Sequence, residues 1–206
     1  MYIIFDFDGT LADTFALGSA LINEYADRLG YKQIDFAANK DKSARELIKM
    51  SGVRFWQIPG LIRFFRQKSV ERAGEVKAFD GIPGLVRRLH DDGFLLGIIT
   101  TNSAQTVSKF LEKYSLTDFF SYIKPEISLF GKRRALRRAR RRLKTEIIYI
   151  GDELRDIEAC RAVNIPIISV SWGFNSTEIL DRNNPGMVAE DVDEVIQKIM
   201  SNGCRH

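Results

Sequence analysis

Two aspartates near the start of the chain, Asp6 and Asp8, have the residue type and spacing that could do chemistry. They follow the apolar run YIIF in MYIIFDFDGT, which is typical of a buried strand. Side chains in a strand alternate with a period of two, so both carboxylates point the same way. Two like charges on one side repel each other and resist burial. We therefore expect a cation to join them or one aspartate to keep a proton, although Asp8-Gly9 alone is also a common turn signal.

A second acidic pair, Asp152 and Asp156, lies in GDELRD after the apolar run EIIYI. Asp156 falls in the first turn of the helix expected next, so this pair alone is equally well explained as a helix cap and a dipole-compensating acid. Together with Asp6 and Asp8, the pair supplies oxygen ligands of the kind and number that Mg²⁺ prefers. The four aspartates therefore predict a Mg²⁺ site.

The polar stretch IITTNS has the residues of a phosphate site. Thr100 ends an apolar run and Thr101 follows it, while Asn102 or Ser103 can cap the next helix. Capping alone would explain these residues. The functional interpretation adds a hydroxyl and free backbone N–H groups at a helix N-terminus, which attract phosphate. On this interpretation, Thr100 and Thr101 contact the phosphate of a substrate.

A basic segment, KRRALRRARRRLK at 132–144, has the periodicity of a helix. At 100° per residue its apolar side chains form one stripe, and Lys132 is the only basic residue aligned with that stripe. A lysine in the first turn would lean toward the carboxyl edge of a sheet beneath it, where it can bridge an aspartate and a bound phosphate. Lys124 in YIKPE competes for this role. We prefer Lys132, but the residues leave the choice open.

The same segment supports an alternative function, in which its arginines bind nucleic acid or an acidic protein. It holds nine basic residues and no acidic ones, and subtracting these nine charges from the net charge of +4 leaves −5 for the rest of the chain. A solvated face is, however, the usual interpretation of such a run, and no aromatic residues are interleaved with the arginines. A binding protein would also not need four acidic residues at strand ends. We therefore expect this role to be secondary.

The candidate residues follow apolar runs that alternate with helical patterns. Runs at 2–5, 94–99, 146–151 and 165–171 are typical of buried strands, with a weaker one at 120–123. This alternation predicts an α/β fold, a Rossmann-like parallel sheet with helices on both faces. Ligands of such a sheet bind at the carboxyl ends of its strands, where these polar residues fall.

One stretch departs from the alternation, because residues 15–77 show only helical periodicity. This predicts a small all-helical cap domain inserted after the first strand, with the core domain formed by residues 1–14 and 78–206. A chain of 206 residues with 45% hydrophobic content is long enough for one sizeable core plus a small appended unit.

The cysteines and the apolar stretches favour a soluble cytoplasmic protein without a membrane partner. Cys160 and Cys204 form neither a disulfide framework nor a zinc-site spacing. The N-terminus lacks the pattern of a signal sequence, and the longest apolar stretches, such as FLLGII, are too short to span a bilayer.

Taken in order, these motifs resemble those of the haloacid dehalogenase superfamily of phosphatases. DFDGT, the threonine of IITTN, a lysine that opens a helix, and GDELRD are similar to the four motifs of that superfamily. The helical insert is similar to the cap domain of its phosphoglycolate phosphatase-like members, and VSWGFNSTEIL at 170–180 is similar to the loop and helix that those members carry after the last motif. Many relatives have lysine followed by proline in the third motif, and here that pair is Lys124-Pro125.

The resemblance implies a role for each candidate residue: Asp6 as nucleophile, Asp8 as acid/base, Thr100 and Lys132 as phosphate ligands, and Asp152 with Asp156 at the metal. A phosphomonoester is an anion, so Asp6 can attack phosphorus only if Mg²⁺ and a lysine offset the repulsion. We therefore predict a Mg²⁺-dependent phosphatase that acts on a small phosphorylated metabolite through an aspartyl-phosphate intermediate. A phosphomutase of the same fold is the alternative, and a dehalogenase is disfavoured because its leaving group does not need Asp8.

Overall fold

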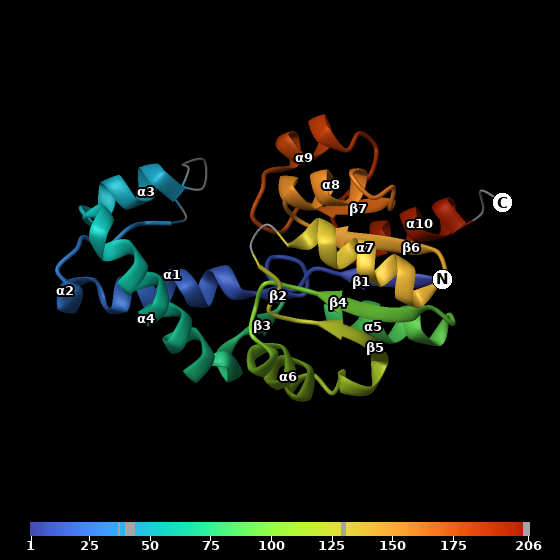
Figure 1. Cartoon of the computed structure of the whole chain (residues 1–206), viewed down its shortest axis with the longest axis horizontal. Helices are drawn as coiled ribbons and strands as arrows, with labels where there is room; N and C mark the ends of the chain where they lie inside the picture. Colours follow the sequence, from blue (N-terminus) through green and yellow to red (C-terminus); the bar gives the residue numbers. More distant parts are fainter. Residues whose placement is uncertain (37, 40–43, 129–130, 204–206) are drawn as a thin grey trace.

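A parallel sheet forms the centre of the computed structural model, which describes residues 1–36, 38–39, 44–128 and 131–203. Within these residues, the sheet has six strands in the order β5-β4-β1-β6-β7-β8 (Figure 1). The strands are β1 (Tyr2–Phe5), β4 (Leu95–Ile99), β5 (Phe120–Lys124), β6 (Ile147–Gly151), β7 (Ile167–Val170) and β8 (Val188–Ala189). All neighbouring pairs are parallel, so the carboxyl ends of the strands meet at one edge.

Helices cover both faces of this sheet because its central strands carry apolar side chains on both sides. In β1, Ile3 and Phe5 pack into one hydrophobic core and Ile4 packs into the other, as the period of two requires. The first core includes residues of α5 (Ile82–Asp91), α6 (Ala104–Lys113) and α10 (Val192–Gly203). The second includes residues of α7 (Lys132–Leu143), α8 (Leu154–Arg161) and α9 (Thr177–Asn183). The predicted fold class is confirmed.

The predicted strands are also confirmed, with ends that differ by one or two residues. The sequence did not predict β8, which pairs with β7 at the edge of the sheet and brings Val188 opposite Ser169. A strand of two residues is too short to show a period of two, so only the tertiary structure reveals it.

Between the end of β1 and the start of α5 lies an insert whose described helices and turns carry the chain away from the sheet. It contains α1 (Thr14–Glu24), α2 (Ala26–Leu29), α3 (Ala44–Ser51) and α4 (Ile58–Glu71), with 3₁₀ turns at Phe55–Gln57 and Ala73–Glu75; a further 3₁₀ turn, Thr117–Phe119, belongs to the core. Figure 1 shows these four helices beside one end of the sheet. The insert confirms the all-helical cap of the predicted fold.

A short antiparallel ribbon joins the two ends of this insert. It pairs β2 (Ala12–Asp13) with β3 (Lys77–Ala78), at the places where the chain enters and leaves the helical region. The ribbon lies close to the predicted boundaries, 14/15 and 77/78, although β2 ends at Asp13. The division of the chain into a core domain, 1–14 and 78–206, and a cap domain, 15–77, stays a prediction.

No helix among the described residues is long and apolar enough to cross a membrane. Cys160 is buried and free, whereas Cys204 lies outside the described residues. The cytoplasmic location stays a prediction.

Candidate active site

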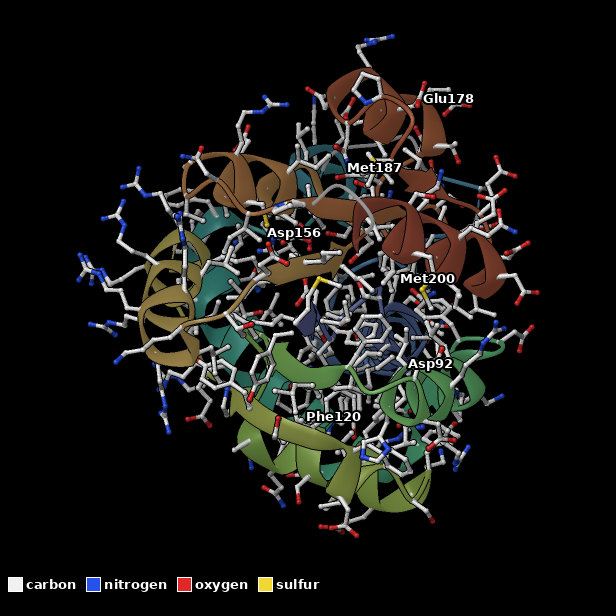
Figure 2. All side chains as sticks on the ribbon, turned by 90° about the vertical axis from the view of Figure 1, so that its right-hand side faces the viewer. Asp92, Phe120, Asp156, Glu178, Met187 and Met200 are labelled. Carbon is white, nitrogen blue, oxygen red and sulfur yellow. The ribbon has the colours of Figure 1, made fainter. Side chains whose placement is uncertain are left out.

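Three carboxylates converge at the carboxyl edge of the sheet. Asp6 follows β1, Asp152 follows β6, and Asp156 lies in the first turn of α8. The Asp6 amide donates a hydrogen bond of 2.8 Å to the Ile150 carbonyl, which fixes the ends of β1 and β6 side by side. One carboxylate oxygen from each aspartate lies within 4.8 Å of the others, and all three residues are buried. Figure 2 shows Asp156 in the interior of the molecule.

Lys132 places an ammonium group between two of these carboxylates. It is the first residue of α7 and is only 4% exposed. Its Nζ donates to Asp6 Oδ2 at 2.6 Å and to Asp156 Oδ1. Burial lowers the pKa of Lys132, but the two carboxylates outweigh this effect and raise the pKa above its ordinary value. The side chain is therefore a fixed cation at the site.

Lys124, the alternative to Lys132, lies elsewhere. It is the last residue of β5 and its side chain is exposed. The apolar stripe of α7, with Leu136 and Ala139 buried against the sheet, carries Lys132 inward with it. The geometry thus brings Lys132 rather than Lys124 to the carboxylates.

The cluster carries more negative charge than Lys132 can neutralise. Burial and the charge of Asp6 raise the pKa of Asp152 to about 8. Burial also raises the pKa of Asp156, although the ammonium group of Lys132 opposes this rise. Three ionised carboxylates and one ammonium leave two negative charges, which a divalent cation would balance. Carboxylates are hard oxygen ligands, so the donor set fits a divalent metal.

Asp8 has different partners from the other three aspartates. Its carboxylate accepts hydrogen bonds from Asn102 Nδ2 at 2.7 Å and from Thr100 Oγ1 at 3.1 Å. Burial, followed by the charge of Asp6, raises the pKa of Asp8, and these hydrogen bonds oppose the rise. A carboxyl group with a raised pKa beside an ionised one is suited to donate a proton. The Asp8 carboxylate is outside the converging group of three, and its role as a metal ligand stays a prediction.

Two residues of the loop after β4, Thr100 and Asn102, donate the hydrogen bonds to Asp8. Thr100 is buried, and its hydroxyl also accepts a hydrogen bond from the Asn102 amide at 2.9 Å. Ser103 is the N-cap of α6 and accepts from the Thr106 amide at 3.1 Å. Of the two predicted capping candidates, Ser103 therefore caps the helix, and Asn102 is left to bind Asp8. Thr101 lines the cavity over the site.

Sequence reasoning missed the residues that hold Asp152. Thr10 Oγ1 donates to Asp152 Oδ1 at 2.9 Å, and the Phe174 amide donates to Oδ2 at 2.8 Å. Gly9 and Gly173 pack so closely that a Cβ atom would lie 2.2 Å and 2.3 Å from Asp152 atoms. Both segments were recognised in the sequence, as DFDGT and as part of the segment 170–180. Sequence patterns do not show, however, that the two segments meet at Asp152.

A cavity of about 540 Å³ lies over the carboxylates, between the core and the insert. Asp8 and Asp152 line it from the core, and Phe15 and Phe36 line it from the insert. The ring centroid of Phe15 lies 5.8 Å from that of Phe36 and 6.3 Å from that of Phe174, which belongs to the core. Aromatic side chains of both parts thus form one wall of the cavity.

The arginines of α7 face away from this site. All seven, at positions 133, 134, 137, 138, 140, 141 and 142, are exposed. Figure 2 shows their nitrogen-tipped side chains spreading outward from the helix. Within the described part of the chain, none of them forms an ion pair with an acidic residue. The helix therefore has two separate faces, one that positions Lys132 and one that is basic and solvated.

Known proteins resemble this chain over almost its whole length. Residues 3–170 match the model of a family described as haloacid dehalogenase-like hydrolase. A phosphoglycolate phosphatase from Synechococcus elongatus is 32% identical over 203 residues, which cover 96% of each chain. Pyrophosphatase PpaX from Listeria monocytogenes is 24% identical over 219 aligned residues, with 94% of each chain covered. Among solved structures, a predicted phosphatase from Clostridium acetobutylicum has a TM-score of 0.78 and 26% identity, with 97% of this chain and 98% of that chain covered.

Proposed function

The chain belongs to the haloacid dehalogenase-like hydrolase family, and from this membership and the geometry of its site we propose that it is a phosphatase for small phosphomonoesters. The observation that carries the proposal is the contact of the Lys132 ammonium with both Asp6 and Asp156. Beside it, Asp8 has a raised pKa. A carboxylate nucleophile, a buried cation and a proton donor are the groups that phosphoryl transfer to an aspartate needs.

In the first half-reaction, an oxygen of Asp6 attacks the phosphorus of the ester. A P–O bond forms to Asp6 while the P–O bond to the leaving group breaks, and Asp8 donates its proton to the departing oxygen. The products are an aspartyl phosphate and a free alcohol. The raised pKa of Asp8 makes the protonated form more available for this step.

In the second half-reaction, water attacks the phosphorus of the aspartyl phosphate. Asp8, now ionised, takes a proton from this water as the P–O bond to Asp6 breaks. Phosphate leaves, and both aspartates return to their starting states. We assign the binding of the phosphate oxygens to Lys132, Thr100 and Thr101.

Asp6, Asp152 and Asp156 would hold the divalent metal, which we propose to be Mg²⁺, with Asp8 as a fourth ligand. When bound, the metal offsets the negative charge of the phosphate oxygens. Lys132 cannot do this alone, because it is already shared between two carboxylates. Thr10 and the Phe174 amide orient Asp152 for its part in the site.

We propose a small phosphorylated metabolite as the substrate, with 2-phosphoglycolate as the first compound to test. The support is the relative named phosphoglycolate phosphatase, which is similar over 96% of both chains. The second compound is pyrophosphate, after the relative named pyrophosphatase PpaX. In this proposal, residues 15–77 act as a cap that closes over the cavity and excludes water from the first half-reaction.

The proposal does not extend to nucleic acid, because no relative reported above is named for such a partner. The exposed arginines of α7 need no ligand, since a solvated face suffices to explain them.

Phosphate release from a panel of phosphomonoesters, with Mg²⁺ and with EDTA in its place, tests the proposed function. We expect release that requires the metal, with the highest kcat/KM on a small substrate. Metal-dependent isomerisation of a sugar phosphate without phosphate release would instead identify a phosphomutase. If neither reaction occurs with folded protein and metal present, the proposed function is wrong.

A further inference from the structure

Arg155 is a cation at the active-site cavity that the proposed mechanism does not use. It is the second residue of α8, between Asp152 and Asp156 in the chain, and it lines the cavity of about 540 Å³. Arg155 lies at the carboxyl end of β6 because the turn between β6 and α8, which also carries Asp152, ends directly before the first turn of α8. Because Lys132 is already assigned to the ester phosphate, a second cation at the cavity needs a role of its own.

The hydrogen bonds of Arg155 leave part of its guanidinium group unused. Its Nη2 donates to Glu153 Oε1 at 2.5 Å. Its Nε is buried and has no hydrogen-bond partner among the described residues. A buried donor without an acceptor is unfavourable, and the guanidinium group prefers an acceptor that takes two of its N–H groups at once. Arg155 is thus prepared for a further anionic acceptor.

The charges around the cavity limit the places where an anionic acceptor can bind. Among the described residues that line it, Arg155 is the only basic one, whereas Asp8, Asp13, Asp152 and Glu153 are acidic. The acidic side chains of the lining repel a second anionic group, and Arg155 is the described lining residue whose charge offsets that repulsion. Lys132 does not serve this second group, because it lies outside the cavity lining, buried against Asp6 and Asp156.

We infer that Arg155 binds a second anionic group, carried by the leaving part of the substrate, and so selects phosphomonoesters with a carboxylate or a further phosphate close to the scissile bond. This inference rests on the proposed function, because the ester phosphate is taken to react at Asp6. Asp8, which protonates the leaving group, lines the same cavity as Arg155. A leaving group of a few atoms therefore has its reacting oxygen and its anionic end within one small space.

The planar guanidinium group suits this role better than an ammonium group would. It can donate two parallel hydrogen bonds to a carboxylate or a phosphate, and its contact with Glu153 holds the side chain in place before the substrate enters. Glu153 is itself partly buried, and burial raises its pKa above the ordinary value while Arg155 opposes that rise.

The test compares three substrates on wild-type protein and on the variants Arg155→Gln and Arg155→Lys. The substrates are 2-phosphoglycolate, pyrophosphate and 2-hydroxyethyl phosphate, in which an uncharged alcohol replaces the carboxylate of phosphoglycolate. Arg161→Gln is the matched control, because Arg161 lies on the same helix, is exposed and does not line the cavity.

For Arg155→Gln we expect kcat/KM to fall by about 10- to 100-fold on the charged substrate that wild type prefers, and by less than about threefold on 2-hydroxyethyl phosphate. Arg155→Lys should lose less than Arg155→Gln, because it keeps the charge but not the paired hydrogen bonds. A lower kcat/KM on 2-phosphoglycolate identifies a carboxylate as the group that Arg155 binds. A lower kcat/KM on pyrophosphate identifies a phosphate. Activity on the uncharged ester also shows that the variant is folded.

An equal fall on all three substrates overturns the inference, since Arg155 would then support the fold or the chemistry and not selectivity. No change on any substrate overturns it as well. Failure of the proposed function looks different, because wild-type protein would then release phosphate from none of the three compounds.

Discussion

Lys132 and Asp6 are 126 positions apart in the chain, yet Nζ of the lysine lies 2.6 Å from Oδ2 of the aspartate, and the same Nζ also contacts Asp156. This contact joins the N-terminus of α7 to the ends of β1 and β6. It places a permanent cation beside the proposed nucleophile, where negative charge must be offset for a phosphate ester to approach.

Removal of this cation should cost most of the activity. We expect Lys132→Gln to lower kcat by about 10²- to 10³-fold, because a preorganised electrostatic partner of the transferring phosphoryl group is lost. Lys124→Gln is the matched control and should keep the wild-type rate, since Lys124 is exposed at the end of β5. Steady-state phosphate release measures both variants, and a larger loss for Lys124→Gln would contradict the assignment.

The role of Asp8 as proton donor predicts a dependence on the leaving group. For Asp8→Asn we expect a fall in kcat of about 10²- to 10⁴-fold on an alkyl phosphate, whose alkoxide needs a proton to depart. On p-nitrophenyl phosphate the fall should be smaller for the first half-reaction, because p-nitrophenolate leaves without a proton. Pre-steady-state measurement of p-nitrophenolate release separates this step from hydrolysis of the intermediate. Equal losses of the first step on both substrates would exclude Asp8 as the acid.

Stability of the metal-free protein should fall as the pH rises. The pKa of Asp152 is about 8 in the folded protein, against an ordinary value of 3.8. Between these values the folded state keeps a proton that the unfolded state has lost, so the free energy of unfolding decreases with pH up to about pH 8 and then levels off. Asp156 acts in the same direction.

Thermal unfolding in EDTA at about pH 6 and about pH 8.5 measures this effect. We expect a lower Tm at the higher pH in EDTA, and a larger increase in Tm on addition of Mg²⁺ at that pH, because the metal binds the ionised carboxylates. Asp152→Asn should flatten the pH dependence in EDTA. A higher Tm at the higher pH in EDTA would contradict the raised pKa values.

Gly173 should be needed for the position of Asp152. A Cβ atom on Gly173 would lie 2.3 Å from the Cβ and Oδ2 atoms of Asp152, so Gly173→Ala must displace that carboxylate. We expect a weaker dependence of Tm on Mg²⁺ and a fall in kcat/KM of at least about 10-fold. Gly84→Ala is the control, because a Cβ atom there meets nothing within 4 Å. Unchanged metal dependence in Gly173→Ala would show that Asp152 does not bind the metal.

Arginines on the outer face of α7 should be dispensable for catalysis. Arg134, Arg137 and Arg141 are exposed and lie on the side of the helix opposite Lys132. A variant with all three changed to Gln should elute from heparin at lower salt and keep kcat/KM within about twofold of wild type. Loss of activity in this variant would connect the basic face to the reaction.

The general plan of the molecule could be predicted from the sequence because it depends on local patterns. Continuous apolar runs identify the buried strands, and alternation with helices gives a parallel sheet whose carboxyl edge collects Asp6 and Asp152. The helical periodicity of α7 favoured Lys132 at that edge, since the apolar stripe of the helix must face the sheet, but it left Lys124 open as an alternative.

Contacts between distant segments could not be predicted in this way. Asn102 binds Asp8 from 94 positions away, and sequence periodicity leaves it equivalent to Ser103 as a helix cap. Thr10 and Phe174 meet at Asp152 only because the loops after β1 and β7 lie next to each other in the folded chain. The Nε of Arg155, which has no hydrogen-bond partner among the described residues, is likewise a consequence of the packing and not of the motif that contains it.

The proposed mechanism requires that Asp6 becomes phosphorylated during the reaction. The most direct measurement is mass spectrometry of the peptide that contains Asp6, after the protein has been mixed with its best substrate and Mg²⁺ and quenched in acid. We predict a phosphoryl group on Asp6 in wild-type protein, and neither this group nor phosphate release in Asp6→Asn. Phosphate release by Asp6→Asn at the wild-type rate would contradict the claim.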